Sequence, residues 1–597
     1  MMRITAKLRL LATTDLHMNL LGFDYATDSQ ALTNGIAGIS TLVAKARAMA
    51  QAGGRAVVLL DNGDFLQGTA LADWHSTRPP TKDHPIIRAF NAMQYDAVGL
   101  GNHDLDYGTT YLAEAIKGLD SPAISTNLAC DALAGVRKHI MIARQVRTTQ
   151  GTSEGTATLN IGVVSALPIE TAIWNKLELP DDATIQDPLD SIADAAALLR
   201  ARGADLVIAL AHMGIGPSKT ANTCGNSGAA VLAQLPDIDV VIAGHTHQRH
   251  PQGDAGETVI GTACPIVMPG YAGADLGVID LDLERGADGK WRIAQQRTAL
   301  WPNTNTVAAD RTITKISAPA HHATRDYLSE TIAEISHDLH SYFGMVCPSD
   351  AHALSARAKA IEVRQALATT PFGQLPLLAT ATARAAGGPN GPTNYIHIPK
   401  GPVLRRHLAN FAPSTNRTCA MLVTGDTLRN WLEHSASVYR QISTDAPEQP
   451  LLDHTNPSFI FDTIYGLDYR IDPSRPVGQR ITTLHHDSKA VTPDQRFVLA
   501  TNHFRAAGGG GYSDLNLPAP LFQSDLSPVQ GFVQALQSDD LAEWTHTAPW
   551  RLNCSGRCKA VFECSPLALR YFDQIRTLSP EILGHTETGF DRVQITL

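Results

Sequence analysis

The most constraining feature of the sequence is a repeated pairing of an apolar run with a polar residue at its carboxyl end. Five short apolar runs have the length of buried strands, and each leads into Asp, Asn or His. They span residues 8–13, 56–60, 95–99, 206–211 and 239–243. Helical patterns lie between several of them, as at 34–52, 86–93 and 188–202. The alternation indicates βαβ crossovers and largely parallel pairing, with two sheets in a sandwich as an alternative.

Length and charge limit the class of protein. At 597 residues the chain exceeds the size at which one core stops growing, so we expect two or more domains. A net charge of −10 argues against a surface that coats polymeric nucleic acid. No apolar run reaches the roughly 18 residues of a membrane span. The N-terminus has no signal-peptide pattern, so we expect either a trimmed export signal or a cytoplasmic protein.

The polar residues at the strand ends have the character of metal ligands. The motifs are Thr14-Asp15-Leu16-His17, Asp61-Asn62-Gly63-Asp64, Gly101-Asn102-His103-Asp104-Leu105-Asp106, the single His212, and Gly244-His245-Thr246-His247. Any one of them could be an ordinary surface loop. Because ligands bind beyond the carboxyl ends of parallel strands, the five together predict one site.

The ligand chemistry of this site favours divalent ions. The candidates supply oxygen and nitrogen and no thiolate: Asp15, His17, Asp64, Asn102, His212, His245 and His247. Such sets suit Mn, Zn, Co or Fe. Two ions about 3.5–4 Å apart would bind phosphate oxygens and hold an attacking hydroxide between them. His103 is left without a ligand role and could protonate a leaving alkoxide; the alternative is a loop histidine that caps a turn.

The motifs D-x-H, G-D, G-N-H-[DE], a single H after a strand, and G-H-x-H, in this order, resemble those of the calcineurin-like metallophosphoesterases. More narrowly, the chain resembles the 5′-nucleotidase family and its branch of bifunctional 2′,3′-cyclic-nucleotide 2′-phosphodiesterase/3′-nucleotidases. The resemblance implies an α/β fold of three parts. These are a four-layer α/β/β/α metallophosphoesterase domain at 1–320, a linker helix at 321–345, and an α/β nucleotide-binding domain at 346–597. Apolar residues at helical spacing between Tyr327 and Phe343 favour the linker helix.

The resemblance also implies a role for each site residue. The first ion would take Asp15, His17, Asp64 and His247. The second would take Asp64 as a bridge, with Asn102, His212 and His245. His103 would be the catalytic histidine and Asp106 its orienting carboxylate, although the cyclic-phosphodiesterase branch often carries Asn at that position.

The substrate side is predicted from aromatic and glycine residues near the end of the chain. Asn502 and Phe504 precede four glycines, 508–511, and Phe504 falls where the family places an aromatic that stacks on the base. Where 5′-nucleotidases read G-G-D-G, this chain has Gly510. The other half of the base clamp would fall at Ser414. Phe411 and Tyr465 are possible substitutes, and core or turn roles are the alternatives for all of these side chains.

We therefore expect metal-dependent hydrolysis of 2′,3′-cyclic nucleotides to 3′-nucleotides, and then to nucleoside and phosphate, by a monomer. Periplasmic location follows from the resemblance alone. The alternatives are a 5′-nucleotidase or nucleotide-sugar hydrolase, a sulfur-compound hydrolase of the same fold, or an inactive nucleotide-binding protein. Among the eight cysteines, the cluster Cys554, Cys558 and Cys564 could contain a disulfide, with buried thiols as the alternative.

Overall fold

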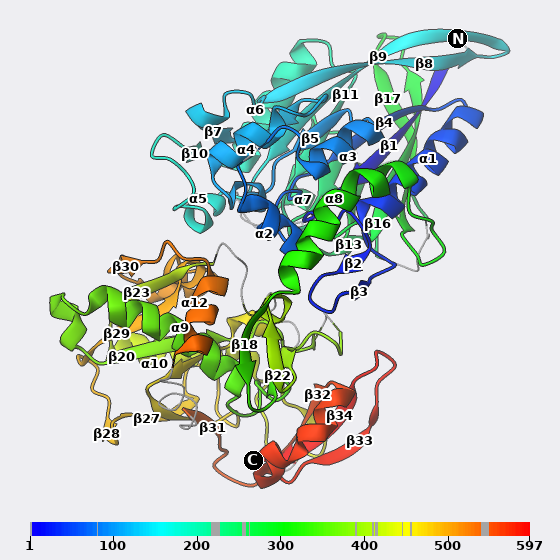
Figure 1. Ribbon diagram of the computed structural model, residues 1–597. Coiled ribbons are helices and arrows are strands. Elements are labelled where there is room, and N and C mark those ends of the chain that lie inside the picture. The colour runs from blue at the N-terminus through cyan, green and yellow to red at the C-terminus, as the bar shows by residue number, and fades with distance from the viewer. Residues whose placement is uncertain are drawn as a thin grey trace. The chain divides into compact units, whose positions relative to one another are not determined.

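The computed structural model divides the chain into two compact units, unit 1 (residues 1–327) and unit 2 (residues 328–597). Figure 1 traces the chain from β1 in blue to β34 in red. The structure describes residues 3–79, 81–216, 227–252, 258–261, 263–388, 391–408, 411, 416–444, 446–453, 456–538 and 549–597.

Unit 1 is built on two sets of parallel strands, as the alternation of strands and helices predicts. One set is β1 (Ile4–Thr13), β4 (Ala56–Asp61), β5 (Ala97–Gly99) and β6 (Ala123–Ile124). The other is β9 (Ser153–Ala166), β11 (Leu206–Ala211), β12 (Val240–Ala243) and β15 (Ile266–Pro269). Antiparallel strands extend and join the sets: β8 (His139–Gln150), β13 (Arg249–His250), β14 (Thr258–Gly261), β16 (Asp275–Arg285) and β17 (Trp291–Pro302).

Apolar side chains alternate along these strands and so face two different layers. Leu10, Leu60, Val163 and Ile208 belong to one core cluster in which both sets of strands pack together. Their neighbours on the opposite face, such as Val207, pack instead with helix residues such as Leu199. This confirms the expected layered α/β fold. The helices of unit 1 are α1 (Ile36–Ala52), α2 (Ala70–Ser76), α3 (Pro85–Met93), α4 (Thr109–Ile116), α5 (Thr171–Trp174), α6 (Pro188–Ala201), α7 (Ala229–Leu232) and α8 (Arg311–Leu328).

The predicted linker helix at 321–345 differs from the structure. Helix α8 begins ten residues earlier, at Arg311, and ends at Leu328, and it contains Pro319. The apolar residues that follow it lie on strands, β18 (Thr331–Ile335) and β19 (Leu339–His340). Ile332 and Ile335 pack at the edge of a core cluster of unit 2, so their helical spacing is a coincidence.

Unit 2 is a mixed α/β unit. Its largest sheet has the strand order β25 (Asp462–Tyr465), β20 (Leu377–Thr382), β29 (Arg496–Asn502), β23 (Thr418–Thr424) and β30 (Phe522–Gln523). Further strands are β21 (His397–Ile398), β22 (Gly401–Leu404), β24 (Gln449–Pro450), β26 (Asp468–Ile471), β27 (Ile481–His486), β28 (Lys489–Ala490), β31 (Trp550–Leu552), β32 (Lys559–Cys564), β33 (Glu581–His585) and β34 (Asp591–Thr596). The helices are α9 (Asp350–Leu367), α10 (Gly425–Ser435), α11 (His503–Ala506) and α12 (Pro528–Gln537).

The cysteine cluster contains free thiols in this structure. Cys554 is half-buried, whereas Cys558 and Cys564 are buried. Burial, together with a hydrogen bond to the thiol of Cys558, raises the pKa of Cys554. A disulfide between two of the three cysteines stays a prediction. Among the described residues, no helix is long and apolar enough to cross a membrane.

Candidate dimetal site

The loops that follow β1, β4 and β12 hold their polar residues in a strained backbone conformation. Asp15, His17, Asp64, His245 and His247 have φ angles of 50°, 47°, 58°, 68° and 58°. This left-handed region costs a non-glycine residue roughly 1–2 kcal/mol, and such residues concentrate at functional sites. The neighbouring contacts impose it: the backbone N–H of His17 donates to the Asp64 carbonyl at 2.8 Å.

Two glycines allow the backbone to approach the buried carboxylates. A Cβ atom at Gly101 would lie 2.1 Å from Oδ1 of Asp64. A Cβ atom at Gly244 would lie 2.7 Å from Oδ2 of Asp15. Both carboxylates are fully buried, and the backbone N–H of His245 donates to both oxygens of Asp15 at 3.0 Å. A glycine is therefore required at each position.

One cluster of potential ligands consists of Asp15, His17 and His247. The Nδ1–H of His17 donates to the Gln67 carbonyl at 2.6 Å, which leaves a lone pair on Nε2. This Nε2 atom lies 3.0 Å from Nε2 of His247, which in turn lies 3.5 Å from Oδ1 of Asp15. Burial lowers the pKa of His17, and it lowers the pKa of His247 to about 2, so both imidazoles are neutral. Neutral imidazoles and a carboxylate that converge in this way favour a cation between them.

The second cluster consists of Asp64, His212 and His245. Nδ1 of His212 donates to the Asn62 carbonyl at 2.8 Å, and its Nε2 lies 3.0 Å from Oδ2 of Asp64. Among the described residues, these two buried atoms have no hydrogen-bond partner. Burial acts to lower the pKa of His212, but Asp64 and Asp15 raise it to about 10. The pocket thus favours positive charge between its carboxylates.

Asn102 and Asp64 connect the parts of the site. Oδ1 of Asn102 lies 2.9 Å from Nδ1 of His245. Oδ2 of Asp64 lies 3.9 Å from Nε2 of His17, a residue of the other cluster. Asp64 therefore stands between the two clusters.

His103 lies beside these clusters, and its ring is paired with Asp106. Its backbone N–H donates to Oδ1 of Asp64 at 2.8 Å, and its ring centroid is 5.4 Å from that of His17. Nδ1 lies 2.8 Å from Oδ2 of Asp106. Burial acts to lower the pKa of His103, but Asp106 and Asp64 raise it to about 9. His103 is thus a protonated imidazolium at neutral pH.

In unit 2, Phe504 and Phe459 border the glycine loop. A Cβ atom at Gly509 would lie 2.5 Å from the half-buried ring of Phe504, and one at Gly510 would lie 3.7 Å from the ring of Phe459. The Phe459 side chain is 41% exposed. The buried Arg505 donates to the carbonyls of Gly509 and Phe459, both at 2.6 Å. Its Nε also pairs with Oδ2 of the buried Asp462 at 2.8 Å.

The other predicted substrate residues have structural roles. Asn502 is the N-cap of α11 and accepts the N–H of Arg505 at 2.9 Å. Phe411 packs against Phe532 in the core, with ring centroids 4.6 Å apart. Tyr465 is 2% exposed. Neither ring is open to a ligand, so the structure argues against Phe411 and Tyr465 as stacking residues. Ser414 lies outside the described residues.

The family model for calcineurin-like phosphoesterases matches residues 8–249, and the model for the 5′-nucleotidase C-terminal domain matches residues 354–516. The 2′,3′-cyclic-nucleotide 2′-phosphodiesterase/3′-nucleotidase of Haemophilus influenzae is 32% identical over 538 residues, which cover 84% of this chain and 80% of that protein. The chain belongs to the 5′-nucleotidase family of calcineurin-like metallophosphoesterases.

Two further relatives agree with this membership. The trifunctional nucleotide phosphoesterase protein YfkN of Bacillus subtilis is 30% identical over 535 residues, although this chain spans only 36% of that longer protein. The 5′-nucleotidase precursor of Thermus thermophilus has a TM-score of 0.61 at 18% identity. The match covers 92% of this chain and all of that structure, and supports the fold alone.

As a member of this family, the protein is a hydrolase of phosphoric ester bonds with two divalent metal ions. Its own residues fit these ions. Each cluster offers a carboxylate and two imidazoles, without thiolate. Oδ2 of Asp64 and Nε2 of His212 are buried without a hydrogen-bond partner among the described residues, which suits atoms that bind a cation. The assignment of individual residues to one ion or the other stays a prediction.

Two residues were not singled out from the sequence. Phe459 begins the apolar run Phe459-Ile460-Phe461, where no motif distinguishes it, and only the fold places it beside Gly510. Asp104 lies within the Gly101–Asp106 motif, yet its role is visible only in the structure. Its carboxylate accepts backbone N–H groups from Gly101, Asp64, Phe65 and Leu66 at 2.8–3.0 Å. It thereby clamps two of the site loops together.

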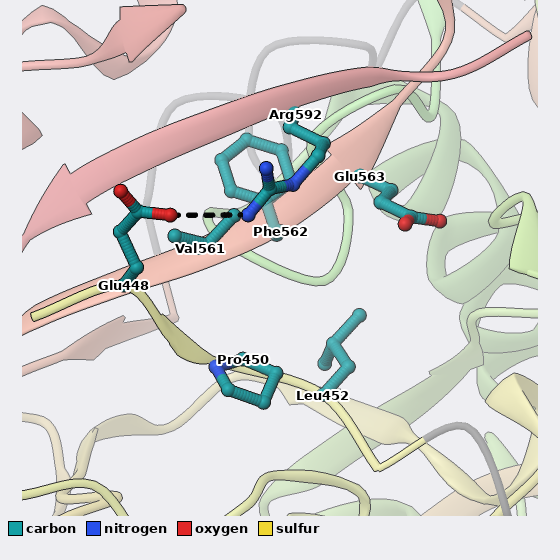
Figure 2. Close-up of a pocket in the computed structure, with 7 residues that line it drawn as sticks. All are labelled: Glu448, Pro450, Leu452, Val561, Phe562, Glu563 and Arg592. Carbon is teal, nitrogen blue, oxygen red and sulfur yellow. Dashed lines mark hydrogen bonds and ion pairs between the residues drawn. The ribbon is translucent and has the colours of Figure 1, made fainter. Parts of the chain in front are cut away.

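Figure 2 shows the side chains that line a pocket in unit 2, which has a volume of about 260 Å³ and includes no residue of the glycine loop in its lining. It is lined by Glu448, Pro450, Leu452, Val561, Phe562, Glu563 and Arg592. The one cationic side chain in this lining, Arg592, is paired with Glu448 at 3.3 Å. With two carboxylates in its lining, the pocket does not suit a phosphate group.

Proposed function

We propose that this enzyme opens 2′,3′-cyclic nucleotides to 3′-nucleotides and then releases the 3′-phosphate. The observation that carries the proposal is the pair of Asp/His clusters with the His103–Asp106 pair beside them. The chain is also 32% identical, over most of its length, to an enzyme named for these two activities.

The proposed roles follow from the contacts of each side chain. Asp15, His17, Asp64 and His247 would hold one ion, and Asp64, Asn102, His212 and His245 the other. Two ions held there would polarise the phosphoryl oxygens and supply the nucleophile at neutral pH. Asp106 keeps a proton on Nδ1 of His103, so Nε2 carries the proton that moves to the leaving ribose oxygen. The imidazolium also stabilises charge that develops on the phosphoryl group.

Recognition of the base is proposed for Phe504 and Phe459. Both rings border the glycine loop, and at least part of each is accessible. Stacking of a base on an aromatic ring contributes about 1–3 kcal/mol and tolerates any base. Arg505 and Asp462 would fix the backbone that carries the two rings.

A 5′-nucleotidase is the second candidate, because Asp106 is the residue that the 5′-nucleotidase pattern has at this position. Gly510 favours the first candidate, since the ribose-binding carboxylate of G-G-D-G is missing. We further propose that the enzyme acts as a monomer on free nucleotides, in the periplasm. Sedimentation of the purified protein and cell fractionation test these two points.

A substrate panel tests the proposal. The enzyme is stripped of metal, reloaded with Mn²⁺ or Co²⁺, and assayed on 2′,3′-cyclic AMP, 3′-AMP and 5′-AMP. We expect hydrolysis of the first two at rates well above that on 5′-AMP. Fast hydrolysis of 5′-AMP alone would favour the second candidate, and no hydrolysis of any of the three would refute both.

A further inference from the structure

Asn175 extends the hydrogen-bond chain of His103 by one residue. It follows α5 directly and is 2% exposed. Its Nδ2 donates to Oδ1 of Asp106 at 2.8 Å, while Oδ2 of the same carboxylate lies 2.8 Å from Nδ1 of His103. The backbone N–H of His103 donates to Asp64 at 2.8 Å. Hydrogen bonds therefore join Asn175 to Asp106 and Asp106 to the ring of His103, while the backbone of His103 is bound separately to the potential ligand Asp64.

The orientation of the Asn175 amide is determined by chemistry. A flipped amide would place its oxygen 2.8 Å from the Asp106 carboxylate, where two acceptors would repel each other. In the orientation present, Oδ1 is buried and has no partner among the described residues. Burial of an acceptor without a partner destabilises the folded protein. In this orientation the amide N–H of Asn175 donates to Asp106, while its Oδ1 accepts no hydrogen bond from the described residues.

The same short segment also touches the metal cluster. Trp174 stacks on His245, with ring centroids 5.3 Å apart and an interplanar angle of 16°. The backbone N–H of Asn175 donates to the Thr171 carbonyl at 3.0 Å, which closes α5 and fixes both side chains. Residues 171–175 therefore contact both the catalytic pair and a predicted ligand.

We propose that Asn175 is a positioning residue for the phosphoester reaction. Its N–H holds the Asp106 carboxylate so that the other carboxylate oxygen faces Nδ1 of His103. This fixes the ring of His103 so that Nε2, and not Nδ1, is the atom that can give a proton to the leaving group. The inference rests on the proposed role of His103 as the acid that protonates the leaving oxygen.

Two simple esters test this inference without any nucleotide. Phenolate is a poor leaving group that needs a proton, whereas p-nitrophenolate leaves without one. For Asn175→Ala we expect kcat on phenyl phosphate to fall about tenfold, with KM changed less than about threefold. On p-nitrophenyl phosphate we expect kcat to fall less than about threefold. The metal content, measured by atomic emission, stays that of the wild type.

Further variants separate positioning from folding. Asn175→Asp keeps the size of the side chain but replaces the donor with an acceptor, and should show the same dependence on the leaving group. Lys176→Ala, at an exposed position on the same segment, should behave as the wild type. In a His103→Ala background, adding Asn175→Ala should change kcat no further.

Equal losses on both esters, or a further loss in the His103→Ala background, would overturn the inference. If Asn175→Ala does not fold, the same comparison is made with Asn175→Asp. If the wild type cleaves both esters but neither 2′,3′-cyclic AMP nor 3′-AMP, the proposed function fails while the test of Asn175 still stands.

Discussion

The carboxylate of Asp64 makes three contacts in the candidate site. Its Oδ1 accepts the backbone N–H of His103, and its Oδ2 faces ring nitrogens of His212 and His17, at 3.0 Å and 3.9 Å. The imidazoles hold the pKa of this carboxyl well below its usual range, against the opposing effect of burial. His103 has a different position, since its ring contacts Asp106 and makes no contact with a carboxylate of the clusters. Loss of either residue should therefore have a different consequence.

For Asp64→Ala we expect loss of both ions and of all hydrolysis, because the residue shared by the two clusters is gone. For His103→Gln we expect both ions to remain and kcat on 3′-AMP to fall at least about a hundredfold, the usual contribution of a general acid. Metal analysis beside steady-state kinetics checks both outcomes. An Asp64→Ala protein that keeps two ions, or a His103→Gln protein with full activity, would contradict these roles.

Asp104 supports the site through hydrogen bonds to its backbone and is not a member of either ligand cluster. Its four backbone hydrogen bonds use both carboxylate oxygens, and asparagine has only one acceptor oxygen. For Asp104→Asn we expect the free energy of unfolding to fall by about 2–3 kcal/mol, because buried N–H groups lose their partner. Thermal unfolding measures this loss, and metal content should fall with it. Asp194→Asn, on an exposed position of α6, is the control, and an equal effect in both proteins would argue against the clamp.

Among the helices and strands, sequence reasoning succeeded where the pattern of burial is apolar and periodic. The strands β1, β4, β11 and β12 and the helices α1, α3 and α6 lie within a few residues of their predicted ranges. The first ten residues of helix α8 were missed because its buried face includes Ser317 and Thr324, which conceal the apolar period. The hydroxyl of Ser317 also donates back to the Ile313 carbonyl at 2.8 Å, which satisfies it within the helix.

The residues of the candidate site also fall into those that the sequence predicts and those that only the fold reveals. The potential ligands follow directly from strand ends, and parallel pairing brings such ends together, so the sequence predicts them. Phe504 lies only four residues before the glycine loop, so the sequence places it there, whereas Phe459 lies 45 residues before Phe504 and only the tertiary fold brings it to the loop. Local periodicity contains no information about such a contact.

Helices α2, α3 and α4 meet at a buried pair of histidines. His75 of α2 and His84, the N-cap of α3, both hydrogen-bond the hydroxyl of Tyr111 of α4, at 2.9 Å and 3.1 Å. Their ring centroids are 4.3 Å apart. Burial, with a smaller effect of Arg78, lowers the pKa of His75 to about 4, and burial together with His75 lowers the pKa of His84 well below its usual range. The folded protein thus keeps both imidazoles neutral.

This packing predicts acid sensitivity. Since both folded pKa values lie below the unfolded value near 6.5, the unfolded chain binds more protons between about pH 4 and 6.5. Stability from the pair is complete above about pH 6.5 and is lost as the pH falls toward 4. Each histidine contributes a slope of up to about 1.4 kcal/mol per pH unit. In denaturant titrations, His75→Gln should have a shallower slope over this range, and an unchanged slope would contradict the prediction.

The proposed roles in hydrolysis and in base recognition fall to different units. The Asp/His clusters and His103 belong to unit 1, whereas Phe504, Phe459 and the glycine loop belong to unit 2. Under the proposed roles, a small aryl phosphate depends only on the first set, because it has no base to stack. A nucleotide would depend on both sets. The two kinds of substrate can therefore report on each unit separately in the intact protein.

For Phe504→Ala and Phe459→Ala we expect KM for 3′-AMP to rise about tenfold each, since one stacked ring contributes roughly 1–3 kcal/mol. The kcat/KM for p-nitrophenyl phosphate should stay within about twofold of the wild type, because the chemistry of unit 1 is intact. Val477→Ala, at a position of unit 2 that is 60% exposed, is the matched control and should leave both substrates unaffected. If the two rings clamp one base, the double variant should lose less than the sum of the single losses, because the first loss already frees the base. Equal losses on the two substrates would mean that these rings support the fold and do not bind the base.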